Sequence, residues 1–328
     1  MYKPEIDIPV ALIFFIRPTP LMEVFQQVRK ARPSKIFLIQ DGPRKNNMRD
    51  LEKIKECQKI VADIDWECEV YKNYSDINLG CGMRPFTGIE WVFNYVDRAI
   101  ILEDDCVPAP TFFPYCKEML EIYENDLRIG FISGLNHFTN FDFGGYSYGF
   151  SEIGAIGGWS TWKSRWQEYD FNMAKLDNRY IKENMESSIL PKTIARKRLM
   201  TWESSKAKID EAKDVSFWDY QWVFAMHLNS WLAIVPEHSQ IRNIGIGIDS
   251  THSGDSYDLL PKGIADFFFI ELKNLDFPLK HPEFVLASRK YDREYYRRIY
   301  PNLFARLSEK RRRILKTLYC KLKFMKFR

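Results

Sequence analysis

Residues 98–113 read Arg98-Ala-Ile-Ile-Leu-Glu-Asp-Asp-Cys-Val-Pro-Ala-Pro-Thr-Phe-Phe113, an apolar run followed by acids and a proline-marked turn. Residues 99–102 are typical of a buried strand. Ligands of open α/β sheets bind at the carboxyl ends of strands, so Glu103, Asp104 and Asp105 form a candidate site. Three adjacent acids repel one another, and a divalent cation or a hydrogen-bonded sugar would compensate their charge. The alternative is a solvated acidic turn that caps the following helix.

Strand-like and helix-like segments alternate on both sides of this stretch. Leu21, Val24, Phe25 and Val28 recur at helical spacing between an N-cap pair at Thr19-Pro20 and the helix-ending Pro33. We expect strands at 10–16, 36–39, 68–71, 99–102 and 129–133, and helices at about 20–32, 47–64 and 90–97. In the second helix, Leu51 should lie on the buried side with Ile54. The alternation predicts an α/β fold with a mixed, mainly parallel sheet flanked by helices.

The composition bounds the class of protein. A chain of 328 residues with 45% hydrophobic residues can build one large domain or slightly more. The six cysteines show no C-x-x-C pair and no zinc-type spacing, so we expect reduced thiols in a cytosolic protein. Residues 1–9 lack the pattern of a signal peptide. No apolar run is long enough for a transmembrane helix. The five histidines are scattered along the chain and do not suggest a zinc site.

The net charge of +4 divides unevenly along the chain. Residues 306–328 carry a net +9, whereas residues 1–305 carry −5. Nucleic-acid-binding proteins more often spread basic charge over the folded domain, so we expect no nucleic-acid partner. The apolar positions Leu315, Leu318, Leu322 and Met325 have helical spacing, and such a basic amphipathic helix lies at an anionic membrane surface. The alternative is a helix that packs its apolar side on the protein itself.

Three further features are candidates for a site. The glycine-rich segment 78–89 contains Arg84, a combination that suits a phosphate-binding loop, although such loops are common. His252, in a polar turn, is either a ligand of a metal or diphosphate or an ordinary turn histidine. Trp159 and Trp162 either stack on a sugar face or belong to the core.

An ordered series of motifs between residues 8 and 254 resembles the GT-A-fold glycosyltransferases. The motifs are Phe15-Ile-Arg-Pro-Thr19, Gln40-Asp41-Gly42, the acidic stretch through Pro108-Ala-Pro-Thr-Phe-Phe-Pro-Tyr115, Phe217-Trp-Asp-Tyr-Gln-Trp222 and the segment 234–247. Within that group, the chain looks like a bacterial protein similar to the animal Golgi N-acetylglucosaminyltransferase that begins complex N-glycans. The resemblance implies a Rossmann-like nucleotide-diphospho-sugar transferase domain at residues 1–256. The family has no counterpart for the residues after about 254; there the strand–helix alternation is lost, and we expect residues 257–328 to be a helical extension that ends in the basic tail.

The resemblance also implies roles for single residues. It places Arg17 at the donor diphosphate and Asp41 at the uracil ring. In the acidic motif it places Asp105 on the metal, Asp104 at the ribose and Glu103 at the donor sugar.

The resemblance places the catalytic base at Asp219, although the animal enzymes have a second acid where this chain has Tyr220. A carboxylate among Phe217, Trp218 and Trp222 would be partly desolvated, as a general base requires. From the residues alone, Asp219 could equally cap a helix or hold a tyrosine.

These features together predict an enzyme that depends on Mn²⁺ or Mg²⁺. We expect it to transfer a hexosyl or N-acetylhexosaminyl group from a nucleotide-sugar donor, UDP-linked, to a saccharide or lipid-linked saccharide, with inversion. We expect it in the cytoplasm, peripheral on the inner face of the membrane. Two alternatives remain: a sugar nucleotidyltransferase, which would need a glycine-rich loop where residues 15–19 have none, and a catalytically silent carbohydrate- or membrane-binding protein with the same fold.

Overall fold

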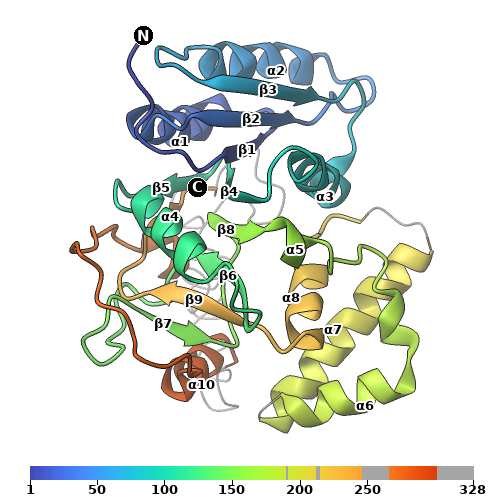
Figure 1. The fold of residues 1–328 in the computed structure, drawn as a ribbon. Coiled ribbons are helices and arrows are strands. Elements are labelled where there is room, and N and C mark those ends of the chain that lie inside the picture. The colour runs from blue at the N-terminus through green and yellow to red at the C-terminus, as the bar shows by residue number, and fades with distance from the viewer. Residues whose placement is uncertain (190, 212–214, 246–265, 301–328) are drawn as a thin grey trace, which may run out of the picture. The chain divides into compact units, whose positions relative to one another are not determined.

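The predicted mixed α/β fold, with a mainly parallel sheet flanked by helices, is confirmed. The structure, a computed structural model, describes residues 1–189, 191–211, 215–245 and 266–300. An eight-stranded sheet has the order β3-β2-β1-β4-β8-β6-β9-β7, and Figure 1 shows β3, β2 and β1 side by side at the top of the view. Its strands are β1 (Val10–Phe14), β2 (Lys35–Gln40), β3 (Glu69–Tyr74), β4 (Arg98–Glu103), β6 (Ile129–Ser133), β7 (Tyr148–Ser151), β8 (Trp159–Trp162) and β9 (Leu232–Pro236).

A second, two-stranded sheet pairs β5 (Cys106–Pro108) with β10 (Ile241–Asn243) in antiparallel orientation. The helices are α1 (Pro18–Ala31), α2 (Met48–Val61), α3 (Gly80–Val92), α4 (Phe112–Ile122), α5 (Lys163–Trp166), α6 (Arg179–Ser188), α7 (Lys192–Asp210), α8 (Asp219–Leu228) and α10 (Arg289–Ile299), with the short 3-10 helices η1 (Ala174–Asp177) and η3 (Asp266–Phe269).

The strand order reverses between β1 and β4. The chain moves outward from β1 through β2 to β3 and then returns to place β4 on the other side of β1, with all of these pairings parallel. Beyond β4, β8 runs antiparallel to both β4 and β6. Ligands of open α/β sheets bind at the carboxyl ends of the two strands that flank such a reversal. The fold therefore points to the segments that follow β1 and β4.

Helices cover both faces of the parallel strands. Val10, Leu12 and Phe14 of β1 share one core cluster with the buried face of α1. On the opposite face, Gly88 of α3 lies so close to Ile39 that a Cβ there would be 2.6 Å from the isoleucine Cγ2. Burial on both faces explains why these strands are continuous apolar runs rather than alternating ones.

The helices differ from the expected ones in their bounds and, in α2, in the residue that points inward. Helix α1 begins at Pro18 rather than after Thr19, because proline preset to helical φ suits the first position of a helix. In α2 the inward residue is Asp50, which accepts hydrogen bonds from Arg44, while Leu51 is exposed. The helix expected at 90–97 instead covers Gly80–Val92, with Pro85 inside it, so the glycine-rich segment is mostly helical and not a loop.

The chain divides into two compact units, residues 1–288 and 289–328. Within the first, residues 273–281 are tied to the preceding domain by hydrogen bonds such as Leu275 N to Thr111 Oγ1 at 3.0 Å. The predicted boundary at 256/257 lies outside the described residues. The second unit contains α10 as its described helix, and the basic tail from residue 301 onward also lies outside. Among the described residues, no helix combines the length and apolar composition that crossing a bilayer requires.

Candidate functional site

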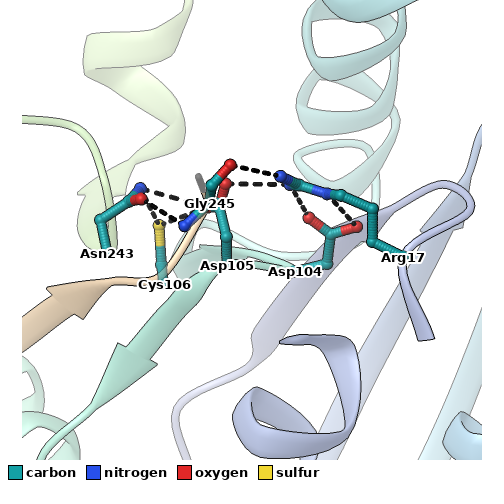
Figure 2. Close-up of polar contacts among 6 residues, drawn as sticks. All are labelled: Arg17, Asp104, Asp105, Cys106, Asn243 and Gly245. Atoms are coloured by element: carbon teal, nitrogen blue, oxygen red, sulfur yellow. Dashed lines mark hydrogen bonds and ion pairs between the residues drawn. The ribbon is translucent and has the colours of Figure 1, made fainter. Parts of the chain in front are cut away.

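An arginine from the end of β1 holds two carboxylates from the end of β4. Strands β1 and β4 pair so that Ile13 lies opposite Glu103, which brings the residues after each strand together. Arg17, the residue before α1, donates from Nη2 to Asp104 Oδ1 and to Asp105 Oδ2, the latter at 2.9 Å. Figure 2 shows the guanidinium facing both carboxylates. The structure therefore brings Arg17, Asp104 and Asp105 into one cluster at the strand reversal.

Burial and charge oppose each other within this cluster. Burial disfavours the guanidinium cation of Arg17, but the attraction of Asp104 and Asp105 outweighs it and raises the arginine pKa. Burial likewise raises the pKa of Asp104, although the charge and hydrogen bonds of Arg17 lower it. One arginine compensates one carboxylate in full, so the cluster retains excess negative charge whenever its acids are ionised.

Glu103 carries the strongest sign of that excess. Burial, together with repulsion from Asp105 and Asp104, raises the pKa of Glu103 to about 8, and Arg17 only partly offsets this. The charge of Asp219 acts in the same direction, so Asp219 lies near enough to Glu103 for their charges to interact. The residue proposed from sequence as the base thus lies within electrostatic range of the acidic cluster.

This pKa gives a prediction for the metal-free protein. Because the pKa of folded Glu103 lies above its ordinary value of 4.5, the folded state keeps a proton that the unfolded state loses. The free energy of unfolding should therefore fall as pH rises from about 4.5 to about 8. In chelator, Glu103→Gln should melt about 2 °C or more above wild type at pH 8.5 and close to it at pH 5. The control is Glu69→Gln, since Glu69 pairs with Lys35 at the surface and should give no such gain; an equal gain at both pH values would contradict this origin.

The far side of Asp105 is held by the short sheet of β5 and β10. Asn243 Nδ2 donates to Asp105 Oδ1 at 3.3 Å, and Cys106 Sγ donates to the same oxygen at 3.3 Å. Asn243 Oδ1 accepts from Gly245 N at 2.8 Å. Figure 2 shows Asn243 and Cys106 on one side of Asp105 and Arg17 on the other. The Asp105 carboxylate therefore accepts hydrogen bonds on both sides, from Arg17 on one and from Asn243 and Cys106 on the other.

Asp219 is the first helical residue of α8, where a carboxylate is favoured by the helix dipole. Its neighbours Phe217, Trp218 and Trp222 are buried, and Tyr169 donates from its hydroxyl to Trp218 O at 2.9 Å. The charge of Asp219 also raises the pKa of Tyr169, after the larger effect of burial. The aromatic neighbours of Asp219 are therefore buried, whereas Asp219 itself is partly exposed, and desolvation of its carboxylate stays a prediction.

The glycine-rich start of α3 supports this segment. A Cβ on Gly82 would lie 2.9 Å from Phe217 O and closer still to Val215 O, and Cys81 Sγ donates to Ser216 O at 3.2 Å. The absence of a side chain at residue 82 lets the chain leading to Asp219 pack against α3. This is a packing role, different from the phosphate loop considered from the sequence.

Asp41 organises the turn that leads into α3. Its Oδ1 accepts from Gly42 N at 2.9 Å and Leu79 N at 2.8 Å, and its Oδ2 accepts from Asn78 Nδ2 at 3.0 Å and Gly80 N at 2.9 Å. Four donors use the acceptor capacity of one carboxylate. Burial raises the pKa of Asp41, and these backbone hydrogen bonds lower it in part. Contact with a uracil ring stays a prediction, whereas the contacts observed are structural.

Asp41→Asn tests the structural role. An amide would point an NH₂ group at backbone N–H donors, so the ligand-free protein should lose about 1–3 kcal/mol of unfolding free energy in urea denaturation. The single substitution is sufficient for this effect, and no other residue of the site needs to be changed. If the variant instead keeps full stability and loses discrimination between nucleotides, Asp41 reads the base.

Arg84 and Asp41 interact through their charges. It is buried within α3, where its Nη2 donates to Asn73 O and, at 2.9 Å, to Asn73 Oδ1. Among the described residues its Nε has no hydrogen-bond partner. Burial lowers the pKa of Arg84, while the charge of Asp41 raises it. A contact with a diphosphate stays a prediction for this residue.

Two sequence-based candidates remain. His252 lies outside the described residues, and within the described ranges no group of three or more His, Cys, Asp or Glu side chains is arranged to hold a metal ion. Trp159 and Trp162 are buried, so both belong to the core and not to an exposed stacking surface. The resemblance included Asn243 and Gly245 in the segment 234–247, compared with the strand and loop that close the donor site. It gave neither residue a role of its own, because their contact with Asp105 depends on the three-residue pairing of β10 with β5.

The comparisons with known proteins give only distant structural likenesses. No family model and no curated protein matches the chain. A UDP-glucose pyrophosphorylase complexed with UDP-glucose is 12% identical over 44% of this chain and 62% of its own, with a TM-score of 0.25. An apo UDP-glucose pyrophosphorylase is 9% identical over 72% and 93%, with a TM-score of 0.36. HddC from Yersinia pseudotuberculosis is 14% identical over 50% and 78%, with a TM-score of 0.28.

This chain thus spans less than two thirds of the first of these proteins. With every one of these TM-scores below 0.5, the likenesses do not assign a function, and similarity to an N-acetylglucosaminyltransferase stays a prediction.

Proposed function

We propose that the chain is a metal-dependent glycosyltransferase. Its donor, a UDP-linked sugar, would bind where the strand order reverses between β1 and β4. One observation carries the proposal: Arg17 after β1 and Asp104 and Asp105 after β4 converge there, with Asp219 close to Glu103. A nucleotide sugar presents a diphosphate and hydroxyl groups, which a guanidinium and carboxylates respectively bind well.

A divalent cation fits the residues present. Hard oxygen donors and excess negative charge suit Mn²⁺ or Mg²⁺, which need few protein ligands because phosphates and water complete their coordination. Asp105, whose side chain is 13% exposed, would hold the ion. The proposed contribution of His252 falls outside the described residues. When bound, the cation offsets the charge that develops on the nucleoside diphosphate as it leaves.

The remaining roles are those that the resemblance to GT-A-fold glycosyltransferases implies. Arg17 contributes a fixed positive charge to the diphosphate, and Asp104 accepts hydrogen bonds from the ribose. Glu103 forms hydrogen bonds with the donor sugar. Asp219 takes the proton of the acceptor hydroxyl. At the same time the acceptor oxygen bonds to the anomeric carbon, and the bond between that carbon and the diphosphate oxygen breaks. This displacement inverts the anomeric carbon.

The products distinguish transfer from nucleotidyl transfer. With a UDP-sugar, Mn²⁺ and a saccharide acceptor, a glycosyltransferase releases UDP, whereas a nucleotidyltransferase given pyrophosphate releases UTP and a sugar 1-phosphate. We expect UDP from at least one UDP-hexose or UDP-N-acetylhexosamine, detected by ion-exchange chromatography, and no UTP. Nucleotide binding without either product would support the catalytically silent alternative.

We also propose that residues 306–328, with a net charge of +9, attach the enzyme to anionic membrane, where a lipid-linked acceptor would reside. Attraction between exposed charges is screened by salt, with a Debye length of about 10 Å at 0.1 M. Full-length protein should therefore sediment with phosphatidylglycerol vesicles at low ionic strength and be released as salt rises. A chain ending at residue 307 should stay in the supernatant and melt cooperatively; loss of that melt would mean that the tail packs on the protein.

A further inference from the structure

We propose that Asn243 and Gly245 are positioning residues for Asp105: the turn after β10 fixes this carboxylate so that its Oδ2 faces Arg17. The inference rests on the proposed function for its role in metal and nucleotide binding, but its geometric part does not. Asn243 and Gly245 lie more than 130 positions after Asp105 in the chain. The three residues meet through backbone pairing, not through any local pattern.

The backbone of β10 is placed over the acidic cluster by its pairing with β5. Asn243 lies opposite Cys106 in this antiparallel pair, directly after Asp105. Ile244 N then donates to Asp105 O at 2.9 Å, which continues the pairing by one residue. The main chain of the turn is thus tied to the main chain of Asp105, so its side chains have a fixed position relative to the carboxylate.

The side chain of Asn243 forms a hydrogen bond with one oxygen of the Asp105 carboxylate. Its Nδ2 donates to Asp105 Oδ1 at 3.3 Å, while its own Oδ1 accepts from Gly245 N at 2.8 Å. That second bond sets which end of the amide faces Asp105. Cys106 Sγ donates to the same Oδ1 at 3.3 Å. Both donors act on Oδ1, which leaves Oδ2 directed to Arg17.

The backbone of Gly245 packs directly against the Asp105 carboxylate, which is possible because glycine has no side chain. A Cβ there would lie 2.9 Å from Asp105 Cγ and closer still to Oδ2, and 3.0 Å from Asn243 Oδ1. Any larger residue must displace the carboxylate or the turn. Gly245 O also accepts from Arg17 Nη1 at 3.5 Å, so the same turn touches both partners of the Arg17–Asp105 pair, as Figure 2 shows.

Gly245→Ala therefore moves the Asp105 carboxylate without removing it. Groups that orient a metal ligand typically change metal affinity 10–100-fold when mutated, so the Kd for Mn²⁺ in the presence of UDP should rise by about that factor. The matched control is Gly157→Ala, because a Cβ at residue 157 would meet Cys106 Sγ at an ordinary 3.6 Å. Asn243→Ala adds no bulk and should weaken Mn²⁺ about tenfold even if Gly245→Ala fails to fold.

A double-mutant cycle separates positioning from a general structural role. Because Asp105→Ala is expected to bind almost no Mn²⁺ with UDP, the cycle is measured as ligand-free stability: Gly245→Ala and Asn243→Ala should cost less stability in the Asp105→Ala background than in wild type, since both are inferred to act through Asp105. If wild type binds Mn²⁺ with UDP but Gly245→Ala and Asn243→Ala bind as tightly as Gly157→Ala, the inference is overturned and the proposed function stands.

Ligand-free melting curves decide the geometric part even if wild type binds no nucleotide, an outcome that would overturn the proposed function alone. Gly245→Ala should lower the melting temperature clearly in the native background and much less in the Asp105→Ala background, where the carboxylate that it would strike is gone. Equal lowering in both backgrounds would show that residue 245 does not press on Asp105, and would overturn the inference by itself.

Discussion

Asp105→Ala should abolish the metal-dependent stabilisation of the protein by UDP. In wild type, UDP at a hundred times its Kd should raise the free energy of unfolding by about 2.7 kcal/mol when Mn²⁺ is present. The variant should gain almost none of this, because Asp105 is the carboxylate proposed to join the cation to the diphosphate. Urea denaturation with UDP and either Mn²⁺ or chelator gives the four values that are needed.

The control for this change is Asp63→Ala, which removes an exposed carboxylate paired with Arg29 far along the chain from the cluster. Exposed ion pairs contribute about 0–1 kcal/mol, so this variant should keep the full UDP effect. If Asp105→Ala retains the 2.7 kcal/mol gain with Mn²⁺, the assignment of the metal to Asp105 is wrong.

Asp219→Asn should separate binding from catalysis. The amide keeps the shape of the side chain but cannot take a proton, so turnover should fall by roughly 10²–10⁴ while the Kd of UDP with Mn²⁺ changes little. Steady-state transfer rates and a UDP titration on the same preparation measure the two quantities. Asp210→Asn, at the exposed end of α7, is the control and should keep normal turnover.

Near-normal turnover in Asp219→Asn would move the role of base to another carboxylate. Asp214 and Asp249 are then the next candidates, and both lie outside the described residues. A parallel loss of UDP binding and turnover would instead mean that Asp219 belongs to the donor site.

The parallel half of the fold was predictable because its strands are buried on both faces. Such strands must be continuous apolar runs, and the runs at β1, β2 and β4 stand out in the sequence. The acidic cluster was predictable for the same reason, since three carboxylates directly after a buried strand must lie at the edge of the sheet. Arg17 follows the neighbouring strand, and the structure brings it into contact with Asp104 and Asp105.

Other features escaped prediction because tertiary contacts determine them. Helix α3 begins in a glycine-rich segment that has low helix propensity, and the packing of Gly82 against Val215 explains the glycine there. Asp50 turns inward at a position next to the expected Leu51 because Arg44 satisfies its carboxylate. The role of Asp41 could not be read from its neighbours, since three of its four donors come from residues 78–80.

The most direct test of the proposed site is the position of the cation itself. Crystals grown with UDP and Mn²⁺, measured at the manganese absorption edge, would show the ion by its anomalous scattering. The proposal requires one manganese peak in contact with an Asp105 carboxylate oxygen and with the UDP diphosphate, at the ends of β1 and β4. A UDP molecule bound elsewhere on the sheet, or a manganese peak that touches neither Asp105 nor the diphosphate, would contradict it.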